Sequence, residues 1–131
     1  MGLFNKILKS TSEAENSIKI NWIALTSIEQ LDALISQSSL KPALIFKHST
    51  RCGISRMALK SFERDCDLNE ENINLYFLDL LKFRNISNAI SVKLNVQHQS
   101  PQAIVVKNEQ VAYHDSHSQI SIDAVKKAIE N

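Results

Sequence analysis

The feature of this sequence that most constrains its fold is the alternation of short apolar segments with segments of helical periodicity. The six residues ALIFKH at 43–48 follow Pro42 and precede a polar turn, so we interpret them as a buried strand. Apolar residues in 28–38 instead recur every three to four positions, as on one face of a helix, and Ser27 with Gln30 forms a possible capping box. The same criteria predict strands at 22–25, 43–48, 73–80, 103–107 and 111–115, and helices at about 28–38, 54–66, 86–95 and 120–129.

The order of these elements predicts a mixed sheet. Strands joined through a helix are normally parallel, whereas the short Asn108-Glu109 link requires its two strands to be antiparallel. We therefore predict an α/β fold with a thioredoxin-like mixed central sheet and helices on both faces.

Length and composition indicate one globular domain with an extension. The chain has 131 residues, which fits one domain, and we divide it into an N-terminal extension and linker at 1–20 and a thioredoxin-like domain at 21–131. Residues 9–18 are polar, and the apolar residues before them predict a short helix that docks on the domain or, as an alternative, a partner or membrane-surface contact.

Charge and hydropathy argue against several partners and locations. With 15 basic and 14 acidic residues, the formal charge is +1, so there is no electrostatic case for binding nucleic acid or an anionic membrane. No apolar run approaches the ~20 residues that span a bilayer. The apolar stretch in the opening MGLFNKILKS is too short for a signal peptide, and no small-residue cleavage site follows it. We therefore expect a cytoplasmic protein.

The most informative stretch is HSTRCGIS at 48–55, which places Cys52 between the end of a strand and the start of a helix. Open α/β sheets bind ligands beyond their strand ends. A helix N-terminus offers unpaired N–H groups and a partial positive charge of about half a unit, which stabilise a thiolate. Arg51 adds positive charge, and Lys47 adds more unless it points to the opposite face. Cys52 is therefore a candidate nucleophile, the alternative being an inert cysteine at a helix start.

The residues at positions 55 and 66 indicate a redox protein with a single reactive thiol. Ser55 stands where a dithiol oxidoreductase has its second cysteine; a serine can donate a hydrogen bond to the thiolate but cannot resolve a mixed disulfide. Cys66 lies 14 residues from Cys52, or about 21 Å along a helix. Because a disulfide needs Cα atoms within about 7 Å, a continuous helix excludes that bond. We interpret Cys66 as a core or helix-end cysteine, with a secondary redox thiol as the alternative.

Three stretches together resemble a known family. LIFKHSTRCGISRMAL, YFLDLLKFRNISNAI and VQHQSPQAIVVKN are similar to the bacillithiol system redox-active protein family of YtxJ-type monothiol bacilliredoxins, which has a thioredoxin-like fold. The resemblance implies that Cys52 is the nucleophile. It also implies a cis-proline at Pro101, with Ser100 and Gln102 shaping the edge that binds the thiol substrate. Gly53 departs from the proline or serine expected there and would loosen the first helical turn that supports the thiolate.

The function implied by the resemblance is removal of bacillithiol from protein mixed disulfides. Bacillithiol would be a co-substrate, no cofactor or metal would be bound, and the partners would be bacillithiolated client proteins. Two alternatives remain open: a non-catalytic thioredoxin-like adaptor, and an iron–sulfur carrier, because CGIS resembles the CGFS turn of monothiol glutaredoxins. Residues 114–121 lack the glycines that such carriers have after the last hairpin.

Several polar residues are weaker candidates. His114 and His117 have no third metal ligand at a sensible spacing, so a surface turn is the better interpretation. His48 and His98 flank the two site segments, and His98 either tunes the thiolate or makes a structural hydrogen bond. Asp79 ends a predicted strand and is a candidate for orienting water during proton transfer; helix capping or solvent exposure is the alternative.

Overall fold

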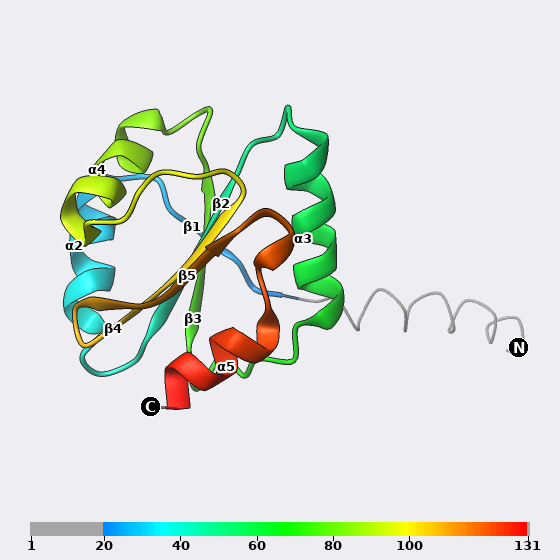
Figure 1. The fold of residues 1–131 in the computed structure, drawn as a ribbon. Coiled ribbons are helices and arrows are strands. Elements are labelled where there is room, and N and C mark those ends of the chain that lie inside the picture. The colour runs from blue at the N-terminus through cyan, green and yellow to red at the C-terminus, as the bar shows by residue number, and fades with distance from the viewer. Residues whose placement is uncertain (1–19, 131) are drawn as a thin grey trace, which may run out of the picture.

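Five strands form one sheet in the order β1-β3-β2-β4-β5, with helices on both sides, in a computed structural model that describes residues 20–130 (Figure 1). The predicted α/β mixed sheet is therefore confirmed, and each predicted element is present to within a few residues. The strands are β1 (Ile23–Ala24), β2 (Ala43–His48), β3 (Asn74–Asp79), β4 (Gln102–Lys107) and β5 (Gln110–Ser116). The helices are α2 (Ile28–Gln37), α3 (Gly53–Asp65), α4 (Arg84–Leu94), the 3-10 turn η1 (His117–Gln119) and α5 (Ile122–Glu130).

The direction of β4 differs from the sequence-based expectation. Strands β1, β2 and β3 are parallel, as predicted, but β4 runs antiparallel to β2 although a helix precedes it. The register pairs Lys47 with Gln102, so β4 begins at the end of the sheet where β2 ends. Residues 95–101 bring the chain from α4 back to that end, so the helix does not cross the sheet as a parallel connection requires. β5 then returns antiparallel to β4 through the predicted Asn108-Glu109 turn.

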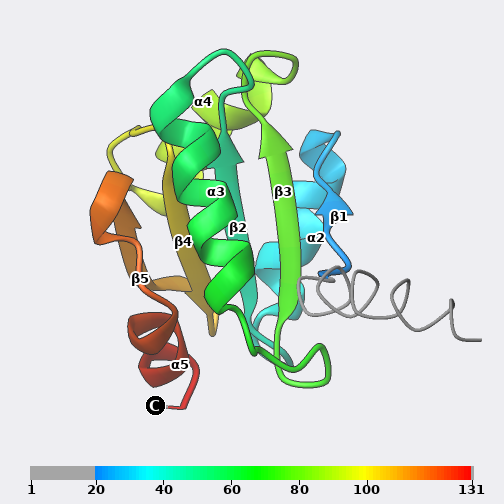
Figure 2. The same cartoon turned by 90° about the vertical axis from the view of Figure 1, so that its right-hand side faces the viewer.

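Each face of the sheet carries its own apolar core. Helices α2 and α4 cover the face that includes Ile45 and Ile104, and α3 and α5 cover the face that includes Phe46 and Val105 (Figure 2). Both faces of the central strands are buried, so β2 and most of β4 contain buried residues in succession.

The N-terminal part of the domain is held by aromatic packing and a helix cap. Trp22 packs its ring against Phe46 and Phe62 and donates a 2.8 Å hydrogen bond from Nε1 to Glu63. The Ser27 hydroxyl accepts from the Gln30 N–H at 3.1 Å, as predicted. The Gln30 side chain instead accepts from the N–H of Thr26, one residue before the cap, so the capping box is shifted rather than reciprocal.

The predicted extension at 1–20 lies outside the described residues except for Ile20, which packs against the core under α3. Within 20–130, no helix is long and apolar enough to span a bilayer.

Candidate functional site

Cys52 is the N-cap residue of α3, at the end of the sheet where β2 and β3 both terminate. Its backbone is extended, with φ −106° and ψ 122°, and its carbonyl accepts the first helical hydrogen bond from the Arg56 N–H at 3.1 Å. The Cys52 N–H donates to the Ser49 carbonyl at 3.2 Å, which fixes the preceding turn. The side chain caps no N–H group and is partly exposed. The predicted position of the thiol, between a strand end and a helix N-terminus, is confirmed.

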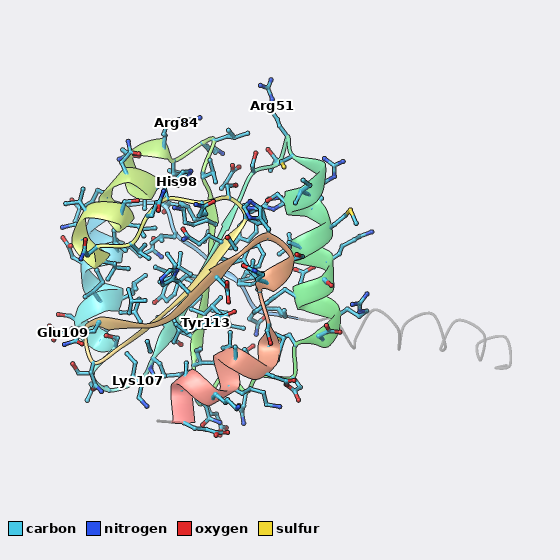
Figure 3. All side chains as sticks on the ribbon, in the orientation of Figure 1. Arg51, Arg84, His98, Lys107, Glu109 and Tyr113 are labelled. Atoms are coloured by element: carbon cyan, nitrogen blue, oxygen red, sulfur yellow. The ribbon has the colours of Figure 1, made fainter. Side chains whose placement is uncertain are left out.

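Arg51 extends from the turn into solvent at the same end of the molecule (Figure 3). An exposed charge of this kind acts on the thiolate only through water and is screened by salt. Its support of the thiolate stays a prediction.

Ser55 lies completely buried below Cys52, in the first turn of α3. Its Oγ accepts a 3.0 Å hydrogen bond from the Ser49 N–H and lies 3.1 Å from Nδ1 of His48. The structure contains no hydrogen bond between Ser55 and the Cys52 side chain. The serine therefore connects the reactive turn to the end of β2.

His48 and Asp79 end neighbouring parallel strands and are opposite each other in the register. His48 is 4% exposed and packs its ring against Phe77, with 5.4 Å between the ring centroids. Burial lowers the pKa of His48, while the Asp79 carboxylate opposes that change. Oδ1 of Asp79 is buried without a hydrogen-bond partner among residues 20–130. Each residue is a separate candidate in the sequence; the matching ends of the two predicted strands were the signal that could have joined them.

A second polar cluster lies on the opposite face of the sheet. Lys47 is 0% exposed, and its Nζ lies 2.7 Å from Nδ1 of His98, which is also 3.3 Å from the Ser87 hydroxyl. Burial lowers the pKa of Lys47 to about 8. Burial also lowers the pKa of His98, and the charges of Lys47 and Arg84 lower it further (Figure 3). His98 therefore makes a structural hydrogen bond, and Lys47 is directed away from the face that carries His48 and Ser55.

The Ser100–Pro101 peptide bond is cis, as the resemblance implies, and directly precedes β4. The Pro101 carbonyl accepts from the His117 N–H at 3.1 Å. The buried Gln102 side chain donates to the Gln97 carbonyl at 3.0 Å, so it holds the loop in place. Oγ of Ser100 is buried and without a partner in the part of the chain that the structure describes.

Gly53 occupies the first helical position but does not need a glycine conformation, because its φ is not positive. A Cβ at this position would meet only Nη2 of Arg56, at an ordinary 3.9 Å. Proline is favoured at a first helical position, where the N–H has no partner within the helix, and the extended Cys52 backbone suits a residue before proline.

We therefore expect Gly53→Pro to increase the free energy of unfolding by about 0.4–1 kcal/mol, because the unfolded chain loses freedom. Urea unfolding of Gly53→Pro and of Gly53→Ala checks the prediction. The alanine variant should show a smaller increase in the free energy of unfolding. A less stable proline variant would contradict the description of this turn.

Cys66 lies at the other end of α3, as its C-cap residue, and packs against the apolar core on that face. Both cysteines are free, and α3 is continuous between them. Burial raises the pKa of the Cys66 thiol. The predicted position of Cys66, in the core or at a helix end, is confirmed.

A groove of about 620 Å³ lies between α3, η1 and α5, beside but not including Cys52. Ile54 and Met57 line it and are 59% and 71% exposed, although both are apolar. His117 also lines the groove. Within residues 20–130 no group of three or more histidine, cysteine or acidic side chains could hold a metal ion.

Comparison with known proteins gives a consistent result. The family model described as monothiol bacilliredoxin BrxC matches residues 23–125. A solved structure described as a candidate oxidoreductase with a thioredoxin fold is 31% identical, with a TM-score of 0.69, over 81% of this chain and 91% of that one. Thioredoxins of Malassezia sympodialis (18% identity, TM-score 0.63, 86% of this chain and 90% of that one) and Plasmodium falciparum (17%, 0.60, 84% and 96%) share the fold.

Proposed function

Since this chain belongs to the monothiol bacilliredoxin family, a group of thioredoxin-like thiol oxidoreductases, we propose that it removes bacillithiol from protein mixed disulfides through Cys52. The observation that carries the proposal is the arrangement of α3. A partly exposed cysteine is its N-cap residue, a serine stands in the position of a resolving cysteine, and the second cysteine is at the far end.

The reaction consists of two thiol–disulfide exchanges. The Cys52 thiolate attacks the bacillithiol sulfur of the client's mixed disulfide; a new disulfide to Cys52 forms, and the client sulfur leaves as a thiolate that takes up a proton. The thiolate of a second bacillithiol then attacks the same bacillithiol sulfur. Cys52 leaves as a thiolate, and the two bacillithiol molecules form a disulfide. In the net reaction, the client's mixed disulfide and one added bacillithiol thiol become a client thiol and a bacillithiol disulfide, so the added bacillithiol is the reductant.

The elements around Cys52 suit this chemistry. The N-terminus of α3 stabilises the thiolate both before attack and as the leaving group. The cis peptide at Pro101 lies at the same end of the sheet, where a mixed disulfide could align along the start of β4. The exposed apolar side chains of Ile54 and Met57 provide a surface for a client protein next to the thiol. Free thiols of this kind persist in a reducing compartment, so we place the reaction in the cytoplasm.

The test is incubation of the reduced protein with a bacillithiolated client, followed by mass analysis of both proteins. We expect one bacillithiol to move to Cys52 and the client to become free, with catalytic turnover once bacillithiol is added. Transfer from a glutathionylated client but not a bacillithiolated one would reject bacillithiol as the substrate. Client binding without any transfer would favour a non-catalytic adaptor instead.

A further inference from the structure

The Ser55 hydroxyl is surrounded by groups that could pass a proton to or from Cys52. One of the two acceptor sites of its Oγ is used by the Ser49 N–H at 3.0 Å. His48 Nδ1 lies 3.1 Å away on another side. The hydroxyl retains one proton and one further acceptor site, and because Ser55 is completely buried, these are not used by bulk water.

Two hydrogen-bonding arrangements satisfy this hydroxyl equally well. If Nδ1 of His48 carries no proton, the Ser55 O–H donates to it, and Oγ can accept a bond from the Cys52 S–H. If Nδ1 carries a proton, it donates to Oγ, and the Ser55 O–H is free to donate to the Cys52 thiolate. The Ser49 N–H bond is unchanged in both arrangements.

Cys52 and Ser55 are the first and fourth residues of a helix start, the N-cap and N3 positions. Side chains at these two positions reach each other's backbone in a capping box, so they are close enough for contact. The Cys52 side chain makes no hydrogen bond to Ser55 in this structure. Rotation of the partly exposed Cys52 side chain about its Cα–Cβ bond is the movement that contact requires.

We propose that Ser55 and His48 form a proton relay for Cys52, in which the direction of the Ser55 hydrogen bond reverses when the thiol ionises. The Cys52 S–H proton passes to Ser55 Oγ as the Ser55 proton passes to His48 Nδ1, leaving a thiolate and an imidazolium. The reverse transfer returns a proton when the sulfur must be neutral. No electrons move, and the serine is unchanged.

The charges around His48 determine how this imidazolium is stabilised. Asp79, opposite it on β3, stabilises the protonated ring, and its buried Oδ1 is free to accept. From α3, Glu63 also favours the protonated ring, whereas Arg56 opposes it. Burial favours the neutral ring, which is the acceptor that the relay needs.

The inference rests on the proposed function only in taking Cys52 as the nucleophile, so it is tested with iodoacetamide rather than bacillithiol. Asparagine at position 48 can keep a hydrogen bond to Ser55 but cannot take up a proton. We expect His48→Asn and Ser55→Ala each to raise the midpoint of Cys52 alkylation against pH by about one unit. Because both remove the same relay, the double variant should show no further rise.

The exposed His114 on β5 provides a matched control, and His114→Asn should leave the midpoint unchanged. Thermal unfolding of each variant distinguishes a relay role from a purely structural one. A purely structural role would lower the stability of the variant without changing the pH midpoint of Cys52 alkylation. A folded His48→Asn protein with a wild-type midpoint, or additive shifts in the double variant, would overturn the relay.

A measurement on the unmodified chain keeps the inference testable even if a variant does not fold. Nitrogen-15 NMR of the imidazole reports which ring nitrogens of His48 carry protons. With Cys52 as a thiolate we expect an imidazolium with protons on both nitrogens, and with Cys52 blocked by methyl methanethiosulfonate we expect a neutral ring protonated only at Nε2. The same protonation state of His48 in both cases would reject the relay, and this result is independent of which low-molecular-weight thiol the protein uses.

Discussion

Replacing Cys52 with serine is expected to reduce bacillithiol transfer to the rate seen without protein. A hydroxyl at this position keeps the helix start, since serine is a favoured N-cap residue, but it cannot form a disulfide. The loss should therefore be complete while the fold and its stability are retained. Mass analysis of client and protein after incubation, beside circular dichroism of the variant, measures both.

Cys66→Ser is the matched control, because it removes the same atom from the opposite end of the same helix. This variant should transfer bacillithiol at nearly the wild-type rate, with some loss of stability from its packing against the core. Loss of transfer in folded Cys66→Ser, or retention in Cys52→Ser, would show that the nucleophile has been assigned to the wrong cysteine.

Lys47→Met is expected to stabilise the protein near neutral pH, although it removes a hydrogen bond. Lys47 is completely buried, and none of the ion pairs within residues 20–130 includes it. Burial lowers its pKa from 10.5 to about 8 in the folded chain. Methionine has a similar length and no charge, and the exposed His98 can hydrogen-bond to water instead.

The pH dependence gives this prediction its sign. Between pH 8 and 10.5 the unfolded chain holds the lysine proton more tightly than the folded chain, so the lysine's destabilising effect declines as pH rises. Below pH 8 the effect is complete, at an upper bound of about 3 kcal/mol from the change in pKa.

Urea unfolding of wild type and Lys47→Met at pH 7 and 10.5 measures the difference directly. The advantage of the variant should be largest at pH 7 and nearly absent at pH 10.5. Comparing the two proteins at each pH cancels the titration of other groups, including Cys66 and Tyr76. Lys60→Met, at an exposed position on α3, should show no such trend. An advantage that is independent of pH would mean that Lys47 is not desolvated.

Local patterns were sufficient to predict most of the fold. Buried strands such as β2 and helix starts such as Ser27 depend on neighbouring residues, so periodicity and caps located them. The expectation of a parallel β4 was wrong. The direction of this strand depends on which end of the sheet residues 95–101 reach, and no local pattern encodes that.

The site was predictable in its centre but not in its surroundings. The position of Cys52 followed from a strand end meeting a helix start, and the cis peptide at Pro101 followed from the family resemblance. The partner of Ser55 depends on the inward direction of His48, which needs the register of the sheet. Lys47 could not be placed in the core from sequence, because lysine is almost never fully buried.

The neighbouring side chains Lys47 and His48 also have a consequence for folding fidelity. Every residue of β2 is buried, so an alternation of polar and apolar residues does not define how this strand aligns with its neighbours. A shift of β2 by one residue would turn the lysine toward Ser55 and the Phe77 ring, and the histidine toward the opposite core. Both polar partners, His98 on one face and Ser55 on the other, would be lost together. The two adjacent residues thus select one alignment of the central strand, and that alignment is the one that places the reactive turn at its end.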